Sequence, residues 1–247
     1  MATKFTYFGG MCILVERSDG YKILFDPYLS ANPATKTTLD EVKDIDLLVV
    51  THNAFDHFGD TIEIMQKSHA LLFAGGEVVR RVQEALPDLP EERFRLTIYG
   101  DEQNYNGSIL RVMPAWHISN CVVNGVVIAN PPFGYVLDVE PGVCYYHAGD
   151  TSLFTDMKLI REMYKPDIMA VGISGIEKKY PCEMNPREAA FATQWIGPNV
   201  VIPTHYEPGS KALGEYLEFV KTTSPKAVVQ TVVDKTWTYT CLLYSSD

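Results

Sequence analysis

The sequence predicts an α/β fold made of two sheets with helices on their outer faces, and three observations support this. Short apolar runs with strand composition fill the first third of the 247-residue chain. Helical and strand-like segments alternate in the second half. Polar residues that can bind a metal follow directly after several of the strands. Because each element buries one face against the next layer, we expect the two halves to meet along one seam, with these polar residues at its edge.

The first third is predicted to be strands because short apolar runs are separated by turn residues. Arg17-Ser-Asp-Gly20 lies between two of these runs and is a good hairpin turn. The predicted strands in this part are 4–8, 11–16, 21–25 and 47–51. Apolar residues then recur with helical spacing at 60–68 and 77–85, and further strands are predicted at 71–74, 109–115, 133–139 and 143–147.

The second half alternates between the two kinds of element. Predicted helices at 155–164, 186–195 and 211–222 separate strands at 167–171, at 200–203 and after residue 227. Pro186, preceded by Asn185, marks a helix start. An N–H in the first turn of a helix has no partner within the helix, so proline loses nothing by lacking one, and the asparagine side chain can cap this turn. No repeat or linker divides the chain, so we predict a single domain over residues 1–247.

Composition limits the classes of function. Hydrophobic residues make up 46% and charged residues 21% of the chain, which is typical of a globular protein with a full core. The net charge is −10 and no basic block occurs, which argues against a nucleic-acid partner. No apolar run approaches 18 residues, and the first residues lack the pattern of a signal peptide, so no membrane association is expected.

The cysteines indicate a reducing compartment. The five cysteines, at positions 12, 121, 144, 182 and 241, are scattered and show no C-x-x-C spacing. Such a set is typical of buried free thiols and not of a disulfide framework or a zinc ribbon. We therefore expect a cytoplasmic protein.

The segment His52-Asn-Ala-Phe-Asp-His57 carries the strongest functional signal, because it follows a predicted strand and holds three potential metal ligands. Three more potential ligands each come just after another strand-like run. The full set of candidate ligands is His52, Asp56, His57, His117, Asp150 and His205. Imidazole and carboxylate together suit Zn, Mn or Fe, so a divalent metal is expected, with Zn or Mn favoured over Fe. The set contains no cysteine, which argues against a structural thiolate zinc site.

A site of this kind predicts hydrolysis. A metal held by histidine and carboxylate usually keeps one position for water and lowers the pKa of that water to about 7. The expected reaction is attack of metal-bound hydroxide on an ester, lactone or phosphoester centre that the metal polarises. Asp56 is the candidate catalytic residue, which would orient the water or take its proton.

Five segments in order along the chain resemble a known family. They are LFDP at 24–27, THNAFDHFGD at 51–60, YHAGDTSLF at 146–154, MNPREAA at 184–190 and VIPTHY at 201–206. Together they resemble metallo-β-lactamase-fold hydrolases, and more narrowly the small bacterial branch of metal-dependent hydrolases related to L-ascorbate-6-phosphate lactonase.

The resemblance implies an αββα sandwich with a two-metal site. One site would use His52 and His117, the other would use Asp56, His57 and His205, and Asp150 would bridge them. Asp26 would hold a ligand histidine in its tautomer.

This chain departs from the family motif H-x-H-x-D-H at one position, because Ala54 stands where the motif has its second histidine. The His52–His117 site has therefore lost a ligand, and we expect occupancy closer to one ion per chain than two, with the other site filled first.

Several assignments stay open. Glu177 or Glu183 could replace the ligand missing at position 54, and Lys178, Lys179 and Arg187 could bind an anionic part of a small-molecule substrate, although a solvated surface is the simpler interpretation.

Other residues near the candidate ligands have structural interpretations. We expect His147 to make a structural hydrogen bond because it should face away from Asp150 on its strand. Trp116 is expected to pack, with a substrate-cleft wall as the alternative, and His69 is expected to be an ordinary surface or packing residue.

Two other functions remain as alternatives. One is a metal-binding protein with a degraded site and little turnover, and the other is a nucleic-acid-processing hydrolase of the same fold. A homo-oligomer is also left open.

Overall fold

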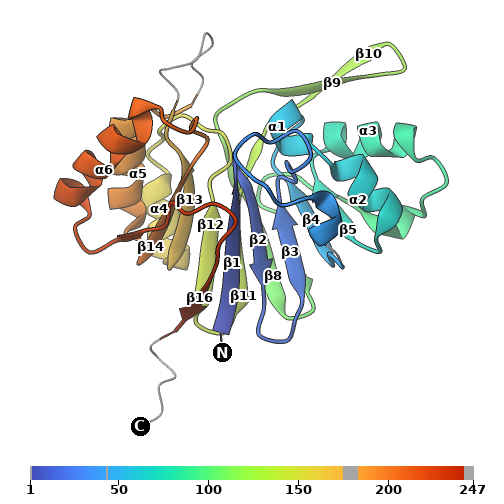
Figure 1. The fold of residues 1–247 in the computed structure, drawn as a ribbon. Helices are drawn as coiled ribbons and strands as arrows, with labels where there is room; N and C mark the ends of the chain where they lie inside the picture. Colours follow the sequence, from blue (N-terminus) through green and yellow to red (C-terminus); the bar gives the residue numbers. More distant parts are fainter. Residues whose placement is uncertain (1, 43, 175–182, 242–247) are drawn as a thin grey trace.

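Two seven-stranded sheets stand at the centre of the molecule, with helices on their outer faces (Figure 1). This arrangement, seen in a computed structural model that describes residues 2–42, 44–174 and 183–241, confirms the predicted fold class. The first sheet contains β1 (Ala2–Gly9), β2 (Cys12–Glu16), β3 (Lys22–Phe25), β4 (Leu47–Val50), β5 (Leu71–Ala74), β6 (Phe94–Leu96) and β16 (Thr236–Thr240). The second contains β7 (Glu102–Tyr105), β8 (Ser108–Pro114), β11 (Phe133–Glu140), β12 (Val143–His147), β13 (Ile168–Gly172), β14 (Val200–Thr204) and β15 (Val228–Val229).

The helices are short and amphipathic. They are α1 (Phe55–Phe58), α2 (Thr61–Lys67), α3 (Gly76–Ala85), α4 (Met157–Tyr164), α5 (Pro186–Ile196) and α6 (Lys211–Thr223), with single 3-10 turns η1 (Leu39–Glu41) and η2 (Glu91–Arg93). The Asn185 cap of α5 is confirmed, because its side chain accepts hydrogen bonds from the backbone of Arg187 and Glu188, each at 3.0 Å. Among the described residues, none of the helices combines the length and the apolar character needed to cross a membrane.

Strand order explains where polar residues can gather. The first sheet runs β16-β1-β2-β3-β4-β5-β6 and the second runs β15-β14-β13-β12-β11-β8-β7. Strands β3 to β6 are parallel to one another, as are β12 to β15. Because parallel strands end at the same edge of a sheet, the residues that follow β3, β4, β12 and β14 are delivered to one end of the sandwich.

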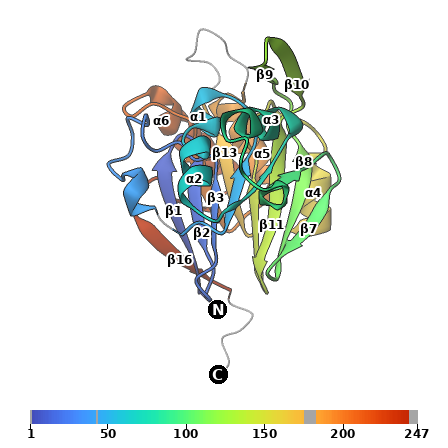
Figure 2. The same cartoon turned by 90° about the vertical axis from the view of Figure 1, so that its right-hand side faces the viewer.

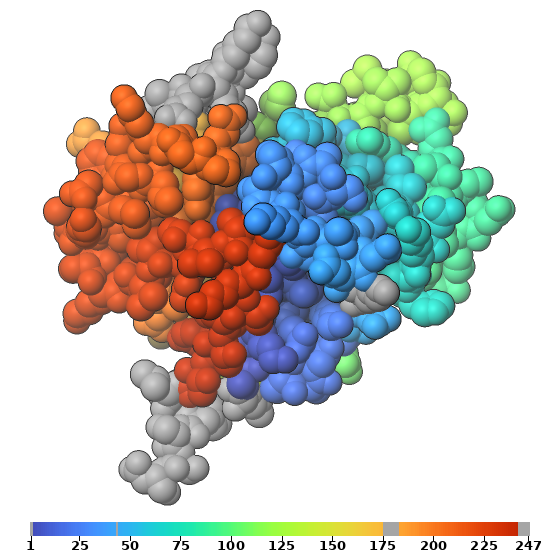
Figure 3. Space-filling view, in the orientation of Figure 1, coloured from blue at the N-terminus to red at the C-terminus, as the bar shows by residue number. Residues whose placement is uncertain are grey.

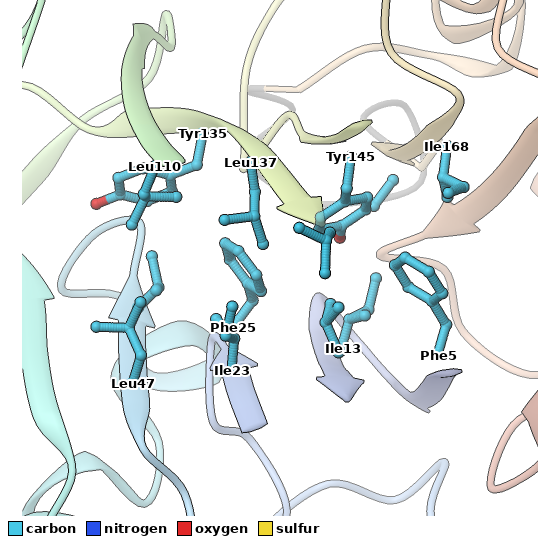
Figure 4. Close-up of a cluster of buried hydrophobic side chains, with 14 of the residues drawn as sticks. Phe5, Ile13, Ile23, Phe25, Leu47, Leu110, Tyr135, Leu137, Tyr145 and Ile168 are labelled. Atoms are coloured by element: carbon cyan, nitrogen blue, oxygen red, sulfur yellow. The ribbon is translucent and has the colours of Figure 1, made fainter. Parts of the chain in front are cut away.

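The main core lies between the two sheets. Phe5, Ile13 and Phe25 from the first sheet meet Leu137 and Tyr145 from the second (Figure 4). Side chains alternate along each strand, so the opposite faces of the sheets remain apolar and must also be covered. Helices α2 and α3 cover the outer face of the first sheet, and α4, α5 and α6 cover that of the second (Figure 2).

The N-terminal and C-terminal parts of the chain share one face of the molecule. Figure 3 shows the blue N-terminal segments lying against the orange and red C-terminal segments. Strand β16 explains this contact, because it pairs antiparallel with β1 from Ala2–Thr240 to Thr6–Thr236. The first sheet is therefore completed by the end of the chain.

The structure contains elements that the sequence did not reveal, among them the edge strands β6 and β7. Strands β9 (Ser119–Val123) and β10 (Val126–Asn130) form a separate two-stranded hairpin that extends beyond the sheets (Figure 1). The one-turn helix α1 lies in the metal-ligand segment, which is too short for helical periodicity to be recognised. The predicted turn at 17–20 is confirmed, because β2 and β3 pair antiparallel and Gly20 has a φ of +90°.

The central core gives a direct test of the packing. Leu137 is fully buried on β11 between the sheets, whereas Leu159 on α4 is 55% exposed. We expect Leu137→Ala to lower the free energy of unfolding by about 2–5 kcal/mol, because it removes packed methyl groups and leaves a cavity. The matched change Leu159→Ala should cost about 0.5 kcal/mol or less. Urea unfolding measures both, and equal losses would contradict this core.

Candidate metal centre

The candidate site forms where strands from both sheets end. Asp26 follows β3 and His52 follows β4 in the first sheet, while Asp150 and His205 come just after β12 and β14 in the second. The remaining candidates are on two connecting segments. The turn α1 carries Asp56 and His57, and the loop between β8 and β9 carries His117.

Four imidazoles point toward one carboxylate oxygen. The Nε2 atoms of His57 and His205 lie 3.2 and 3.5 Å from Oδ2 of Asp150. Those of His52 and His117 lie 3.9 Å from the same oxygen. His205 Nε2 is also 3.0 Å from Oδ2 of Asp56. The fold thus brings together all six residues that the sequence proposed as ligands. Within the residues that the structure describes, the triads with the geometry to hold an ion are His52–His57–Asp150, Asp56–His57–His205 and Asp150–Glu183–His205.

The donor atoms fit a bound cation. Within the described part of the chain, Nε2 of His52, Nε2 of His57 and Oδ1 of Asp150 are buried without a hydrogen-bond partner. Buried polar atoms normally have partners, so a cluster of unpaired buried atoms directed to one place indicates a binding site for a cation. Two ligand atoms that are each about 2.1 Å from a tetrahedral ion stand about 3.4 Å apart, which matches the closer of these separations.

Behind the ligand atoms, Asp26 lies fully buried and fixes the orientation of His57. Its Oδ2 accepts a hydrogen bond from Nδ1 of His57 at 2.9 Å, which leaves Nε2 of that ring free to face Asp150. The backbone N–H of Thr51 donates to Asp26 Oδ1 at 2.8 Å. Burial raises the pKa of Asp26, but the charges and hydrogen bonds of His57 and His147 outweigh it and hold the pKa well below its usual range.

Thr51 is a site residue that the sequence interpretation missed. Its hydroxyl lies 3.0 Å from both oxygens of Asp26 and 3.1 Å from Nδ1 of His52 and of His57. It therefore contacts the rear nitrogen of two candidate ligands. The available signal was its position, since it is the polar residue that ends an apolar strand directly before His52.

His205 is held in place through its backbone and its second ring nitrogen. Its φ is +56°, in the left-handed region that non-glycine residues rarely adopt. The N–H of His205 donates to the carbonyl of Gly10 at 3.0 Å, and the Ser174 hydroxyl donates to its carbonyl. Nδ1 lies 2.8 Å from Oε2 of Glu183. Strained backbone held by several contacts is characteristic of functional sites.

Electrostatics separate the histidines into two groups. Burial, followed by the neighbouring His57, lowers the pKa of His52 to about 3, so this imidazole is neutral and able to bind a metal. Burial also lowers the pKa of His205, but Asp150, Asp56 and Glu183 outweigh it and raise the pKa to about 10. Because a ligand histidine must release this proton, metal binding should strengthen as the pH rises.

Some assignments are corrected or refined by the structure. The expectation that Trp116 packs is wrong, because its side chain is 64% exposed beside His117. The structural role of His147 is confirmed, since its Nε2 hydrogen-bonds Asp26 at 3.0 Å and its Nδ1 hydrogen-bonds the hydroxyl of Tyr145 at 2.7 Å.

The residues considered as extra ligands or anion-binding groups fall in different places. Glu183 lies against Nδ1 of His205, which belongs to the site with the complete ligand set. Arg187 stands over the ring of Phe191 on α5. Glu177, Lys178 and Lys179 lie outside the described residues. His69 is exposed, as expected.

Comparison with known proteins gives consistent matches. Residues 21–206 match the family described as the Beta-lactamase superfamily domain. A UPF0173 metal-dependent hydrolase from Methanopyrus kandleri is 38% identical over 205 residues, which cover 82% of this chain and 84% of the relative. Another, from Thermococcus kodakarensis, is 36% identical over 92% of this chain and 94% of the relative. The solved structure of Igni18, a metallo hydrolase from Ignicoccus hospitalis, superposes with a TM-score of 0.78 at 29% identity, covering 97% of this chain and 99% of that one.

The support that Asp26 gives to His57 can be tested by metal binding. We expect Asp26→Asn to weaken metal affinity by about 10- to 100-fold, because the amide cannot stabilise the imidazole as the carboxylate does. Competition with a chromogenic chelator measures this affinity. Asp138→Asn is the matched control. Asp138 pairs with Arg111 at 2.7 Å near the end of β11 that lies away from the metal centre. Equal affinity in the two variants would show that Asp26 does not act on the metal site.

Proposed function

This chain belongs to the β-lactamase superfamily and is a metal-dependent hydrolase, and on that premise we propose that it cleaves an ester, lactone or phosphoester at the histidine–aspartate cluster. One observation carries the proposal. The four imidazole Nε2 atoms of the cluster face a single oxygen of Asp150. A cluster of imidazole and carboxylate donors without a cysteine suits a catalytic divalent ion better than a structural thiolate site, because such centres keep a position for water.

We propose that Asp56, His57 and His205 hold one ion, that His52 and His117 contribute to a second position, and that Asp150 lies between them. The nitrogen and oxygen donors favour Zn or Mn, with Fe as the third candidate. Thr51 and Asp26 would keep the rear nitrogen of the ligand rings engaged. When bound, the metal would polarise the substrate and lower the pKa of a water molecule to about 7.

Asp56 is the candidate catalytic residue of the proposed mechanism. Burial raises its pKa, but the hydrogen bond from His205 and the charges of His57 and His205 lower it to about 2. Asp56 is therefore ionised at neutral pH and can accept a hydrogen bond on a carboxylate oxygen. It also lines a small hollow with Tyr28 and Phe55, so this carboxylate can be reached from outside. Of the two roles proposed for Asp56, the low pKa favours orienting an attacking water over taking its proton.

Location is part of the same proposal. Cys12, Cys121 and Cys144 are buried free thiols, and Cys241 is also unpaired in the described part of the chain. Free cysteines persist in reducing compartments, so we propose the cytoplasm.

Turnover of simple chromogenic substrates tests the proposed function. The metal-loaded chain should hydrolyse 4-nitrophenyl acetate or bis(4-nitrophenyl) phosphate, and chelation should abolish the activity. Asp150→Asn should lower kcat/KM by about 100-fold or more, because it removes the charge that the ligand cluster faces. Stoichiometric metal without turnover of any such substrate would favour the alternative of a degraded site.

The alanine at position 54 leads to a prediction about metal content. The Asp56–His57–His205 position keeps its ligands, whereas the His52–His117 position lacks the third histidine of the motif. We expect the purified chain to contain about one ion, and Ala54→His to raise this toward two, because an added imidazole restores the ligand set. Elemental analysis by mass spectrometry gives the ratio. Two tightly held ions in the unaltered chain would contradict the effect assigned to Ala54.

A nucleic-acid substrate is the alternative that charge argues against. A chain with a net charge of −10 and no basic block lacks the electrostatic attraction that dominates such binding. We therefore expect dissociation constants for RNA and DNA to be weaker than about 1 μM at physiological salt. Fluorescence anisotropy with labelled oligonucleotides checks this, and tighter, salt-dependent binding would revive the alternative.

A further inference from the structure

Two hollows of different character flank the candidate metal centre. The one on the His117 side has a volume of about 720 Å³ and is walled by Tyr99, Trp116, Ile118, Pro131, Pro132 and Ser152. The one on the His205 side is smaller, at about 190 Å³, and includes the carboxylates of Asp56 and Glu207. The space beside the proposed ligands is therefore large and apolar on one side and small and acidic on the other.

The larger hollow carries no fixed charge. Among the described residues that line it, the ionisable groups are His117, one of the proposed ligands, and the phenol of Tyr99. The Tyr99 hydroxyl donates to the carbonyl of Pro132 at 3.0 Å, so its polar end already has a partner within the wall of the cleft. A cleft with these walls gains free energy by covering apolar surface and offers no charged side chain to pair with a charged substituent.

Trp116 stands on a fixed backbone although its side chain is exposed. Its N–H donates to Oγ1 of Thr151 at 2.8 Å, and its carbonyl accepts from the N–H of Ser152 at 3.2 Å. Thr151 and Ser152 directly follow Asp150, so the indole is anchored beside the metal centre. A large exposed aromatic side chain on an ordered backbone next to a catalytic site is a typical ligand contact.

The β9–β10 hairpin begins next to the cleft, after Ile118, and is also anchored to the ligand segment. The N–H of Asn53, next to His52, donates to the hydroxyl of Ser119 at 3.0 Å, and its side chain donates to the carbonyl of Asn120 at 2.6 Å. The Ser119 hydroxyl in turn donates to Glu77 on α3 at 2.5 Å. The base of the hairpin is thus held against the metal-ligand loop, and the residues that flank the hairpin, Ile118 and Pro131, line the cleft.

We propose that the cleft beside His117 binds the uncharged, apolar acyl substituent of a carboxylic ester or lactone, in preference to a phosphoester. This inference rests on the proposed hydrolytic function. Its physical basis is that His117 lines the cleft and also faces Asp150, so a group seated against Trp116 continues directly to the position of the reacting carbonyl. Hydrolysis then adds water across the acyl C–O bond, which gives a carboxylic acid and an alcohol from an ester, or a single hydroxy acid from a lactone.

Acyl-chain length tests this substrate class. With the metal-loaded chain, kcat/KM should be at least about 10-fold higher for 4-nitrophenyl hexanoate than for the acetate, since each buried CH₂ can contribute up to about 4-fold. Bis(4-nitrophenyl) phosphate should be the poorest of the three substrates. Trp116→Ala should lower the hexanoate-to-acetate ratio by about 5-fold, because it removes the main apolar wall.

A matched variant separates the cleft from a general effect of exposed apolar surface. Val127 on β10 is 67% exposed, much like Trp116, but it does not line the cleft. Val127→Ala should leave the hexanoate-to-acetate ratio unchanged. If Val127→Ala lowers the ratio as much as Trp116→Ala, and gel filtration shows a dimer dissociating, the surface is an interface between two copies of the chain and the proposal is overturned.

Binding without turnover distinguishes failure of the cleft from failure of the hydrolytic function. 4-Nitrophenyl hexyl ether has no carbonyl to cleave, and calorimetry should show it binding the unaltered chain about 5-fold more tightly than Trp116→Ala. Trp116-dependent ether binding without hydrolysis of either ester would support the cleft and contradict the hydrolytic function. Hydrolysis with a flat chain-length profile, or a preference for the phosphodiester, would overturn the proposed substrate class.

Discussion

The buried carboxylate of Asp26 is the constraint on which the rest of the centre depends. It follows a strand of the first sheet, and His147 reaches it from the second sheet at 3.0 Å, so one charge joins the two sheets beneath the ligands. A buried carboxylate is costly unless it is fully paired. Here two histidines and the backbone N–H and hydroxyl of Thr51 contact it. Any relative movement of the sheets would break these contacts, which keeps the ligand histidines aligned.

The chemistry of the centre follows from the different partners of the two nitrogens in each imidazole ring. In His52, His57 and His205 the Nε2 atom faces Asp150, while Nδ1 meets Thr51, Asp26 or Glu183. This division sets which nitrogen is available as a donor and explains why the Nε2 atoms are left facing one point. A metal bound there would be held by oriented ligands, with Asp56 at the margin where substrate and water can approach.

The surroundings of the centre are as asymmetric as its ligand set. The complete set, Asp56, His57 and His205, lies beside the small acidic hollow, whereas His117 opens onto the larger apolar cleft. Loops and a hairpin shape this cleft, while the sheets hold the ligands. This is the usual division of labour in a fold that serves many reactions, because the scaffold fixes the metal and the connecting segments select the substrate.

The sequence by itself determined the layers of the fold and the six candidate ligands. Apolar periodicity located most strands and helices, and the histidines and aspartates stood out because they follow those strands. Only the tertiary structure decided that four imidazoles converge on one oxygen of Asp150, that Thr51 contacts two of them, and that Trp116 is exposed. The periodicity of apolar residues is a local pattern, and it indicates only which face of a helix or strand is buried. The direction of a side chain in a loop depends on residues far away in the sequence, such as Asp26 against His147, and these meet only when the two sheets pack.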